Sequence, residues 1–141
     1  MRRYLDASVI VPFLLPEPST PLVVDFLLMA GTQLTIGDFA AAEVSSAVSR
    51  LARIQHISPS QASEVLERFD DWRADISDTI ALSPEDLRLA DRFVRQFEHG
   101  LRAPDAIHVA SCWRWELPLV TLDRRLARAA TALGVSAEVP A

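Results

Sequence analysis

Apolar positions along the chain follow two patterns, short continuous runs and longer segments in which they recur every three or four residues. The short runs predict strands over residues 3–5, 33–36, 75–82, 117–122 and 135–139. The longer segments predict helices over residues 7–15, 19–29, 39–54, 58–72, 84–97, 103–115 and 124–133. Strands and helices thus follow the order β-α-α-β-α-α-β-α-α-β-α-β. This order predicts an α/β fold, a three-layer α/β/α sandwich with a mostly parallel central sheet.

Local signals mark several helix ends. Ser58 and Ser83 each precede a proline, an arrangement typical of a helix N-terminus. Asp38 and Asp123 are expected to cap the helices that follow them, and Gly31 is expected to end the helix over residues 19–29. These boundaries predict where polar side chains lie relative to the strands.

Length and composition indicate one domain over residues 1–141, with half of the residues apolar and enough of them for a core. No apolar stretch reaches the roughly 20 residues that cross a bilayer, so we expect no membrane association. The single cysteine, Cys112, excludes an internal disulfide and suits a reducing cytoplasm. We expect its thiol to be buried in a helix.

The charge pattern narrows the possible functions. The net charge of −5 argues against binding nucleic acid by bulk electrostatics alone. All 14 basic residues are arginine, which excludes mechanisms that need a lysine: Walker-type phosphate binding, Schiff-base chemistry and phosphoacceptor receiver domains.

Acidic residues occur where a parallel sheet would place a ligand site. Asp6 ends the first predicted strand and Asp123 ends the strand over residues 117–122, so both are expected at the carboxyl edge of the sheet. Asp105 follows a proline in the first turn of its helix, and Glu43 interrupts an otherwise apolar helix start. Each acid alone is explained equally well as a cap or a surface residue.

Together these four acids predict a metal site. Clustered carboxylates repel one another unless metal ions, protons or arginines compensate. Oxygen ligands without a set of His or Cys suit one or two Mg²⁺ or Mn²⁺ ions. Such ions activate a water for attack on a phosphodiester. Apart from these four acids, the other 15 of the 19 acidic residues nearly balance the 14 arginines, so a metal-loaded protein need not repel RNA.

At these residues the chain resembles the PIN-domain family, and within it the VapC-type toxin ribonucleases of type II toxin–antitoxin systems. The segments that carry the resemblance are Tyr4-Leu5-Asp6-Ala7-Ser8, Ala42-Glu43-Val44, Leu101 to Ala110 around Asp105, and Val120 to Leu126 around Asp123. The resemblance covers essentially the whole chain, and its four motifs occur in order at family-like spacing.

The resemblance implies an RNase H-like fold and Mg²⁺- or Mn²⁺-dependent endoribonuclease activity that leaves a 5′-phosphate and a 3′-hydroxyl. It also implies a homodimer and inhibition by a cognate antitoxin. Asp6 and Asp105 are the expected direct metal ligands, with Glu43 and Asp123 bound directly or through water. Ser8 and Thr121 match hydroxyl positions that support the ligands, although capping hydroxyls explain them equally well.

Other residues have two interpretations each. The RNA-phosphate candidates Arg102, Arg124 and Arg125 are equally explained as solvated surface charges. We expect His108 to be a packing residue rather than part of the site. For Trp113 and Trp115 we favour core or edge packing over a dimer or antitoxin surface. Two alternative functions stay open, a DNA-directed nuclease on the same fold and a non-catalytic PIN-like module that binds RNA or protein.

Overall fold

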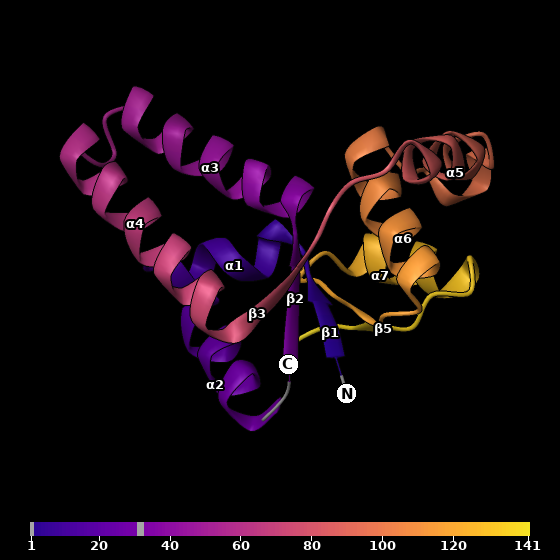
Figure 1. Ribbon diagram of the computed structural model, residues 1–141, viewed down its shortest axis with the longest axis horizontal. Helices are drawn as coiled ribbons and strands as arrows, with labels where there is room; N and C mark the ends of the chain where they lie inside the picture. Colours follow the sequence, from indigo (N-terminus) through magenta and orange to yellow (C-terminus); the bar gives the residue numbers. More distant parts are fainter. Residues whose placement is uncertain (1, 31–32) are drawn as a thin grey trace.

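The computed structural model describes residues 2–30 and 33–141, so the predicted helix end at Gly31 lies outside the described residues. Its strands are β1 (Arg2–Leu5), β2 (Gln33–Gly37), β3 (Ser77–Ile80), β4 (Leu119–Val120) and β5 (Ala137–Glu138). They form one sheet in the order β3-β2-β1-β4-β5 (Figure 1). All four pairings between the described strands are parallel, which confirms the predicted sheet.

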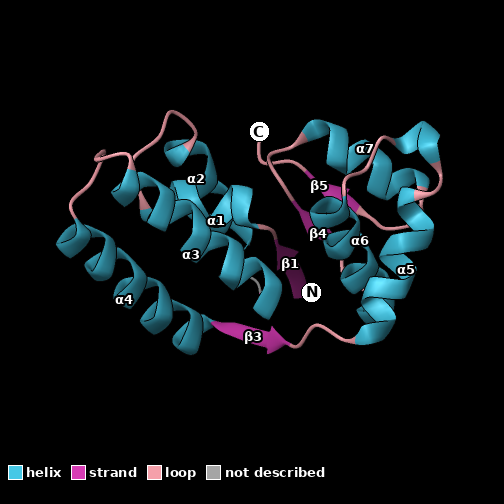
Figure 2. Cartoon of the chain, turned by 90° about the horizontal axis from the view of Figure 1, so that it is seen from above, coloured by secondary structure: helices cyan, strands magenta, loops and turns pink. Residues whose placement is uncertain are grey.

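Helices cover both faces of this sheet. They are α1 (Ala7–Leu14), α2 (Thr20–Ala30), α3 (Asp38–Arg53), α4 (Pro59–Ile76), α5 (Pro84–Val94), α6 (Ala103–Trp115) and α7 (Arg124–Ala132), with a 3₁₀ turn, η1 (Phe97–His99), before α6. Figure 2 shows α1 to α4 on one side of the strands and α5 to α7 on the other. The predicted three-layer α/β/α sandwich is therefore confirmed.

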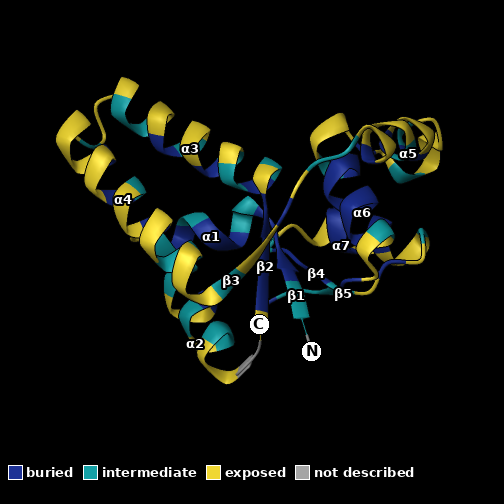
Figure 3. Cartoon of the chain, viewed as in Figure 1, coloured by how far each residue is buried: buried dark blue, intermediate teal, exposed yellow. Residues whose placement is uncertain are grey.

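Alternating side chains along the central strands supply the two cores. On β1, Tyr4 packs with α5, α6 and α7, whereas Leu5 packs with α1 to α4. On β4, Leu119 and Val120 divide between the two cores in the same way. This follows from the two-residue period of a strand, which directs successive side chains to opposite faces. Figure 3 shows that α6 is buried along most of its length, between the sheet and its neighbouring helices.

Strand order places a switch point beside β1. The chain passes from β1 to β2 and β3 on one side, and then returns to form β4 and β5 on the other. Right-handed crossovers therefore put the two groups of helices on opposite faces. In such sheets the loops beyond the carboxyl ends of the strands diverge at the switch point and leave room for a ligand. Here that point lies between the ends of β1 and β4.

Several predicted boundaries are wrong for identifiable reasons. Asp38 does not cap α3: it is the first helical residue, the cap is Gly37, and the Asp38 carboxylate pairs with Arg73 at 3.0 Å. Helix α4 continues four residues past the predicted end, and there Arg73 also donates to the Ile36 carbonyl oxygen. Strand β3 consequently begins at Ser77 rather than at residue 75.

Two further elements are shorter than predicted. Helix α5 ends at Val94, and the chain then forms η1. Strand β4 does not begin at Leu117, because the Leu117 N–H donates to the Cys112 carbonyl oxygen at 3.0 Å and so closes the end of α6. Glu116 adopts a left-handed conformation there, with φ of 53°.

Among the described residues, no helix has both the length and the apolar character needed to cross a membrane.

Candidate active site

Four acidic side chains lie at the carboxyl end of the sheet, where the sequence predicts them. Asp6 follows β1 and is the N-cap of α1, and Asp123 follows β4 and is the N-cap of α7. Asp105 lies in the first turn of α6, and Glu43 lies on α3. Because β1 and β4 are parallel neighbours, Asp6 and Asp123 flank the switch point of the sheet.

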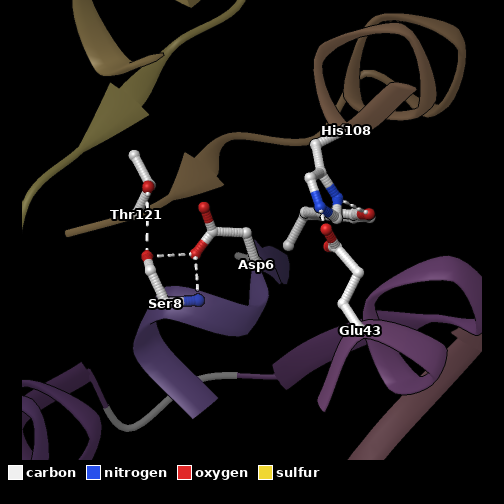
Figure 4. A network of polar contacts seen from close by, with 6 residues as sticks. Asp6, Ser8, Glu43, His108 and Thr121 are labelled. Carbon is white, nitrogen blue, oxygen red and sulfur yellow. Dashed lines mark hydrogen bonds and ion pairs between the residues drawn. The ribbon is translucent and has the colours of Figure 1, made fainter. Parts of the chain in front are cut away.

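Asp6 is the most buried of the four, with 4% of its surface exposed. Its carboxylate accepts hydrogen bonds from the backbone N–H of Ser8 at 3.0 Å and from the Ser8 hydroxyl at 2.5 Å (Figure 4). Burial raises the pKa of Asp6 and outweighs the hydroxyls of Ser8 and Thr121 and the nearby His108, which lower it. The ionised form of Asp6 is therefore costly in the protein without a cation.

Ser8 and Thr121 join the ends of β1 and β4. The Ser8 oxygen accepts a hydrogen bond from the Leu122 N–H at 2.9 Å. It also lies 3.2 Å from the Thr121 hydroxyl (Figure 4). Thr121 in turn accepts from the Asp123 N–H at 3.0 Å. The Ser8 hydroxyl donates to Asp6, and its oxygen is also in hydrogen-bond contact with Thr121. The two predicted supporting hydroxyls therefore form one chain that ends on the Asp6 carboxylate.

Asp105 and Asp123 face a common pocket. This pocket has a volume of about 300 Å³ and is lined by His99, Gly100, Leu101, Arg102, Asp105, Asp123, Arg125 and Leu126. Burial raises the pKa of Asp105, and the carboxylates of Asp123 and Glu43 raise it further, while His108 and Arg102 lower it. Asp123 is exposed and accepts from the N–H groups of Arg125 and Leu126, at 2.9 and 3.2 Å.

Glu43 is held by a residue that the sequence did not assign to the site. Its carboxylate contacts the ring nitrogen Nε2 of His108 (Figure 4). The other ring nitrogen, Nδ1, lies 2.6 Å from the Tyr4 hydroxyl. His108 is buried, as expected of a packing residue, but contrary to the expectation that it lies outside the site its ring also contacts the candidate ligand Glu43. The available signal was its position one helical turn after Asp105.

The three candidate arginines are exposed, but they do not occupy equivalent places. Arg102 and Arg125 line the pocket with Asp105 and Asp123, whereas Arg124 does not. Among the described residues, none of the three arginines takes part in an ion pair. Arg102 and Arg125 therefore leave positive charge free beside the acids.

A model of the PIN-domain family matches residues 3–132. The chain belongs to the PIN-domain family. No curated protein sequence matches it.

Solved structures share this PIN fold at low sequence identity. FitAcB from Neisseria gonorrhoeae is 20% identical with a TM-score of 0.76, covering 99% of this chain and 98% of its own. VapC20 from Mycobacterium tuberculosis, described as a sarcin–ricin loop cleaving toxin, is 12% identical with a TM-score of 0.70, covering 96% of both chains. A toxin–antitoxin complex from Klebsiella pneumoniae is 19% identical with a TM-score of 0.61, covering 86% of both chains. At these identities the likeness shows a common fold.

The donor chemistry of this PIN domain fits a hard divalent cation. Four carboxylates lie at one end of the sheet, and a cation there would offset the burial that raises the pKa of Asp6 and the burial and repulsion that raise the pKa of Asp105. Within residues 2–30 and 33–141, no three His, Cys, Asp or Glu side chains are grouped closely enough to hold one ion. Asp6, Glu43 and Asp123 each use one carboxylate oxygen in a hydrogen bond within the protein, which leaves the other oxygen of each for a cation.

Trp113 and Trp115 do not pack in the core, so of the favoured prediction of core or edge packing only edge packing remains. They are 54% and 44% exposed, and the guanidinium of Arg114 lies 5.0 Å from the ring centroid of Trp115. Two hollows of about 850 and 1030 Å³ lie around Trp113 and Arg114, and none of the four acids lines either. Cys112 is buried and unpaired, as predicted, and burial raises its pKa.

Proposed function

We propose that this PIN domain is a Mg²⁺- or Mn²⁺-dependent endoribonuclease and the toxin of a type II toxin–antitoxin pair. The observation that carries the proposal is the placement of Asp6, Glu43, Asp105 and Asp123 at the carboxyl end of the sheet, where burial raises the pKa of Asp6, and burial together with the carboxylates of Asp123 and Glu43 raises that of Asp105. Such an arrangement is costly without a cation, and hydrolysis of a phosphodiester uses a cation at that place.

Each residue of the proposed site has a distinct task. Asp6 and Asp105 would be direct ligands of the ion, with Glu43 and Asp123 binding it directly or through water. When bound, the ion supplies Lewis-acid activation of a water and neutralises charge that develops on the scissile phosphate. Ser8 holds Asp6 in place through its 2.5 Å hydrogen bond.

Two arginines are suited to hold the RNA backbone. Arg102 and Arg125 line the pocket that contains Asp105 and Asp123, which would place a phosphate between the guanidinium groups and the ion. Arg124 lies outside this pocket lining, so its proposed contact would be to a phosphate farther along the strand.

The assignment as a toxin is supported by family membership and by the described roles of proteins with this fold. VapC20 is a toxin that cleaves the sarcin–ricin loop, and the Klebsiella pneumoniae structure is a toxin–antitoxin complex. We propose that this chain likewise forms a homodimer in the cytoplasm and is inhibited by a cognate antitoxin. Induced expression should then arrest bacterial growth with the wild type but not with Asp6→Asn, and light scattering should give the mass of two chains.

The deciding experiment for the chemistry is cleavage of a mixed pool of total RNA and single-stranded DNA with Mg²⁺ or Mn²⁺. Wild type should give discrete RNA cuts that EDTA and Asp6→Asn abolish. Asp70→Asn, which neutralises an exposed acid on α4, is the matched control and should cut normally. Cutting of DNA alone would identify a DNA-directed nuclease, and failure to cut either polymer would favour a non-catalytic binding module.

A further inference from the structure

A chain of polar contacts crosses the buried space between the sheet and two helices. It begins at Tyr4 in β1, whose hydroxyl lies 2.6 Å from Nδ1 of His108 in α6. It continues from Nε2 of His108 to the carboxylate of Glu43 in α3 (Figure 4). The chain therefore connects the elements that carry three of the candidate ligands, because Asp6 follows β1 and Asp105 is on α6.

The partners determine where the protons lie. A carboxylate only accepts hydrogen bonds, so Nε2 of His108 carries the proton that is donated to Glu43. In the neutral ring Nδ1 is then an acceptor, and the Tyr4 hydroxyl donates to it. A tyrosine phenol has one O–H to donate, and at 2.6 Å from Nδ1 it can fill this place. Tyr4 thus selects the tautomer of His108 that can donate to Glu43.

Packing fixes the first two members of the chain. Tyr4 is 1% exposed and His108 is 3% exposed. The His108 ring lies edge-on to Tyr4 and to Phe39, with ring centroids 5.6 and 5.3 Å away. Gly37 lies against the Tyr4 ring, because a Cβ at that position would be in van der Waals contact with the ring and its hydroxyl, at 3.4 Å from each. Neither ring can therefore move without disturbing the core.

Glu43 differs from these two residues in its freedom. Its side chain is 31% exposed and has three rotatable bonds, so fixing it in one conformation costs side-chain entropy. Among the described residues, His108 is the side chain that hydrogen-bonds the Glu43 carboxylate. A rigid donor therefore orients a mobile acid at the edge of the site.

We propose that Tyr4 and His108 are positioning residues: Tyr4 holds His108, and His108 holds Glu43 ready to bind the divalent cation. This inference rests on the proposed function, since it takes Glu43 as a ligand, but it concerns the protein before RNA binds. Residues that hydrogen-bond a metal ligand from outside the site commonly change metal affinity by about 10- to 100-fold when they are removed.

The first test is Tyr4→Phe, which removes one oxygen and leaves the ring in place. Mn²⁺ binding is measured by calorimetry on the RNA-free protein, and we expect an affinity about 10-fold weaker than that of the wild type. Saturating Mn²⁺ should then restore most of the cleavage rate. Thr35→Val is the matched control. It removes another buried hydroxyl, from the residue paired with Tyr4 across β1 and β2, and should bind Mn²⁺ as the wild type does.

The second test asks whether the effect passes through Glu43. Glu43→Gln should weaken Mn²⁺ binding, and adding Tyr4→Phe to it should cause no further loss, because residues that act in one chain are not additive. His108→Gln retains a side-chain N–H and should bind more tightly than His108→Leu, which has none. Thermal unfolding in EDTA establishes that each variant is folded.

Specific outcomes would overturn the proposal. Wild-type Mn²⁺ affinity in folded Tyr4→Phe and His108→Leu would reduce the chain to a structural role. An equal loss from Tyr4→Phe in the Glu43→Gln background would mean that Tyr4 acts on the site by another route. If Glu43→Gln bound Mn²⁺ normally while wild type cut RNA, this inference would fail and the proposed function would stand. If the wild type neither bound Mn²⁺ nor cut RNA, both this inference and the proposed function would be wrong.

Discussion

The Ser8 hydroxyl donates a 2.5 Å hydrogen bond to the Asp6 carboxylate, and the same oxygen accepts from the Leu122 N–H at 2.9 Å. Ser8 therefore connects the end of β1 to the end of β4 at the switch point of the sheet. The Ser8 oxygen also lies 3.2 Å from the Thr121 hydroxyl, so groups from the β4 side surround the hydroxyl that donates to Asp6.

Ser8→Ala should reduce both activity and stability. The Asp6 carboxylate keeps the backbone N–H of residue 8 but loses its hydroxyl donor, and Leu122 and Thr121 lose an acceptor. We expect cleavage to fall about 10-fold or more and the free energy of unfolding to fall by about 1–2 kcal/mol. Urea unfolding and single-turnover cleavage measure the two effects. Ser49→Ala, on the exposed surface of α3, should change neither, and cleavage by Ser8→Ala at the wild-type rate would contradict the assignment.

Asp6→Asn should abolish cleavage and leave the metal-free protein as stable as the wild type or more stable. Asparagine is also a good N-cap, and it removes a buried charge whose ionisation is unfavourable. We expect the same of Asp105→Asn. Thermal unfolding in EDTA makes the comparison, and added Mn²⁺ should raise the Tm of the wild type more than that of either variant. A sharp loss of stability in EDTA for both variants would reassign these acids to structural capping.

The metal-free protein should show a definite pH dependence. Burial holds the pKa of Asp6 above its ordinary value of 3.8. Its favourable contribution is therefore complete below the unfolded-state pKa and is lost as the pH rises through the folded-state value. The unfolding free energy of the wild type, relative to that of Asp6→Asn, should be highest at about pH 4 and should decrease toward about pH 7. Urea unfolding in EDTA at several pH values tests this, and the opposite slope would indicate a lowered pKa.

Asp86 forms a structural ion pair that should respond differently. It is fully buried and accepts from Nε and Nη2 of Arg114, at 2.6 and 2.9 Å. Burial alone would raise the pKa of Asp86, but the hydrogen bonds from Arg114 and from the Ser83 backbone lower it overall. Its contribution to stability is therefore present above the unfolded-state pKa and lost as the pH falls through the lower folded-state value.

Asp86→Asn should reduce the free energy of unfolding by about 2–4 kcal/mol, because Arg114 loses its counter-charge. The matched control is Asp91→Asn, whose carboxylate pairs with Arg95 on the surface and should cost less than about 1 kcal/mol. Both proteins should bind Mn²⁺ normally. If urea unfolding gave the same loss of unfolding free energy for both variants, the buried Asp86–Arg114 pair would stabilise the protein no more than the surface pair does.

Arg125→Gln should weaken RNA binding rather than chemistry. Arg125 lines the pocket with Asp105 and Asp123, so its removal should raise KM while kcat changes little. The slope of log affinity against log salt should become smaller by about one unit. Arg128→Gln, an exposed arginine of α7 that does not line the pocket, is the control. A fall in kcat alone would place Arg125 nearer the reacting phosphate.

Short-range sequence signals predicted much of the fold. The bounds of α6, at Ala103 and Trp115, match the prediction, since a proline near the first turn marks its start and the apolar spacing marks its length. Ser58 and Ser83 cap α4 and α5 as predicted, each in a capping box. Asp6 and Asp123 were located because a residue that ends a strand and precedes a helix is identified from its neighbours alone.

The sequence by itself determined the order of elements, the parallel sheet and the acids at its carboxyl end, because these depend on periodicity and on caps a few residues long. Only the tertiary structure decided the contact of His108 with Glu43, 65 positions apart, and of Tyr4 with His108, 104 positions apart. It also left Trp113 and Trp115 exposed. Such relationships depend on which crossover brings which helix face to the sheet, and local patterns carry no information about partners that far along the chain.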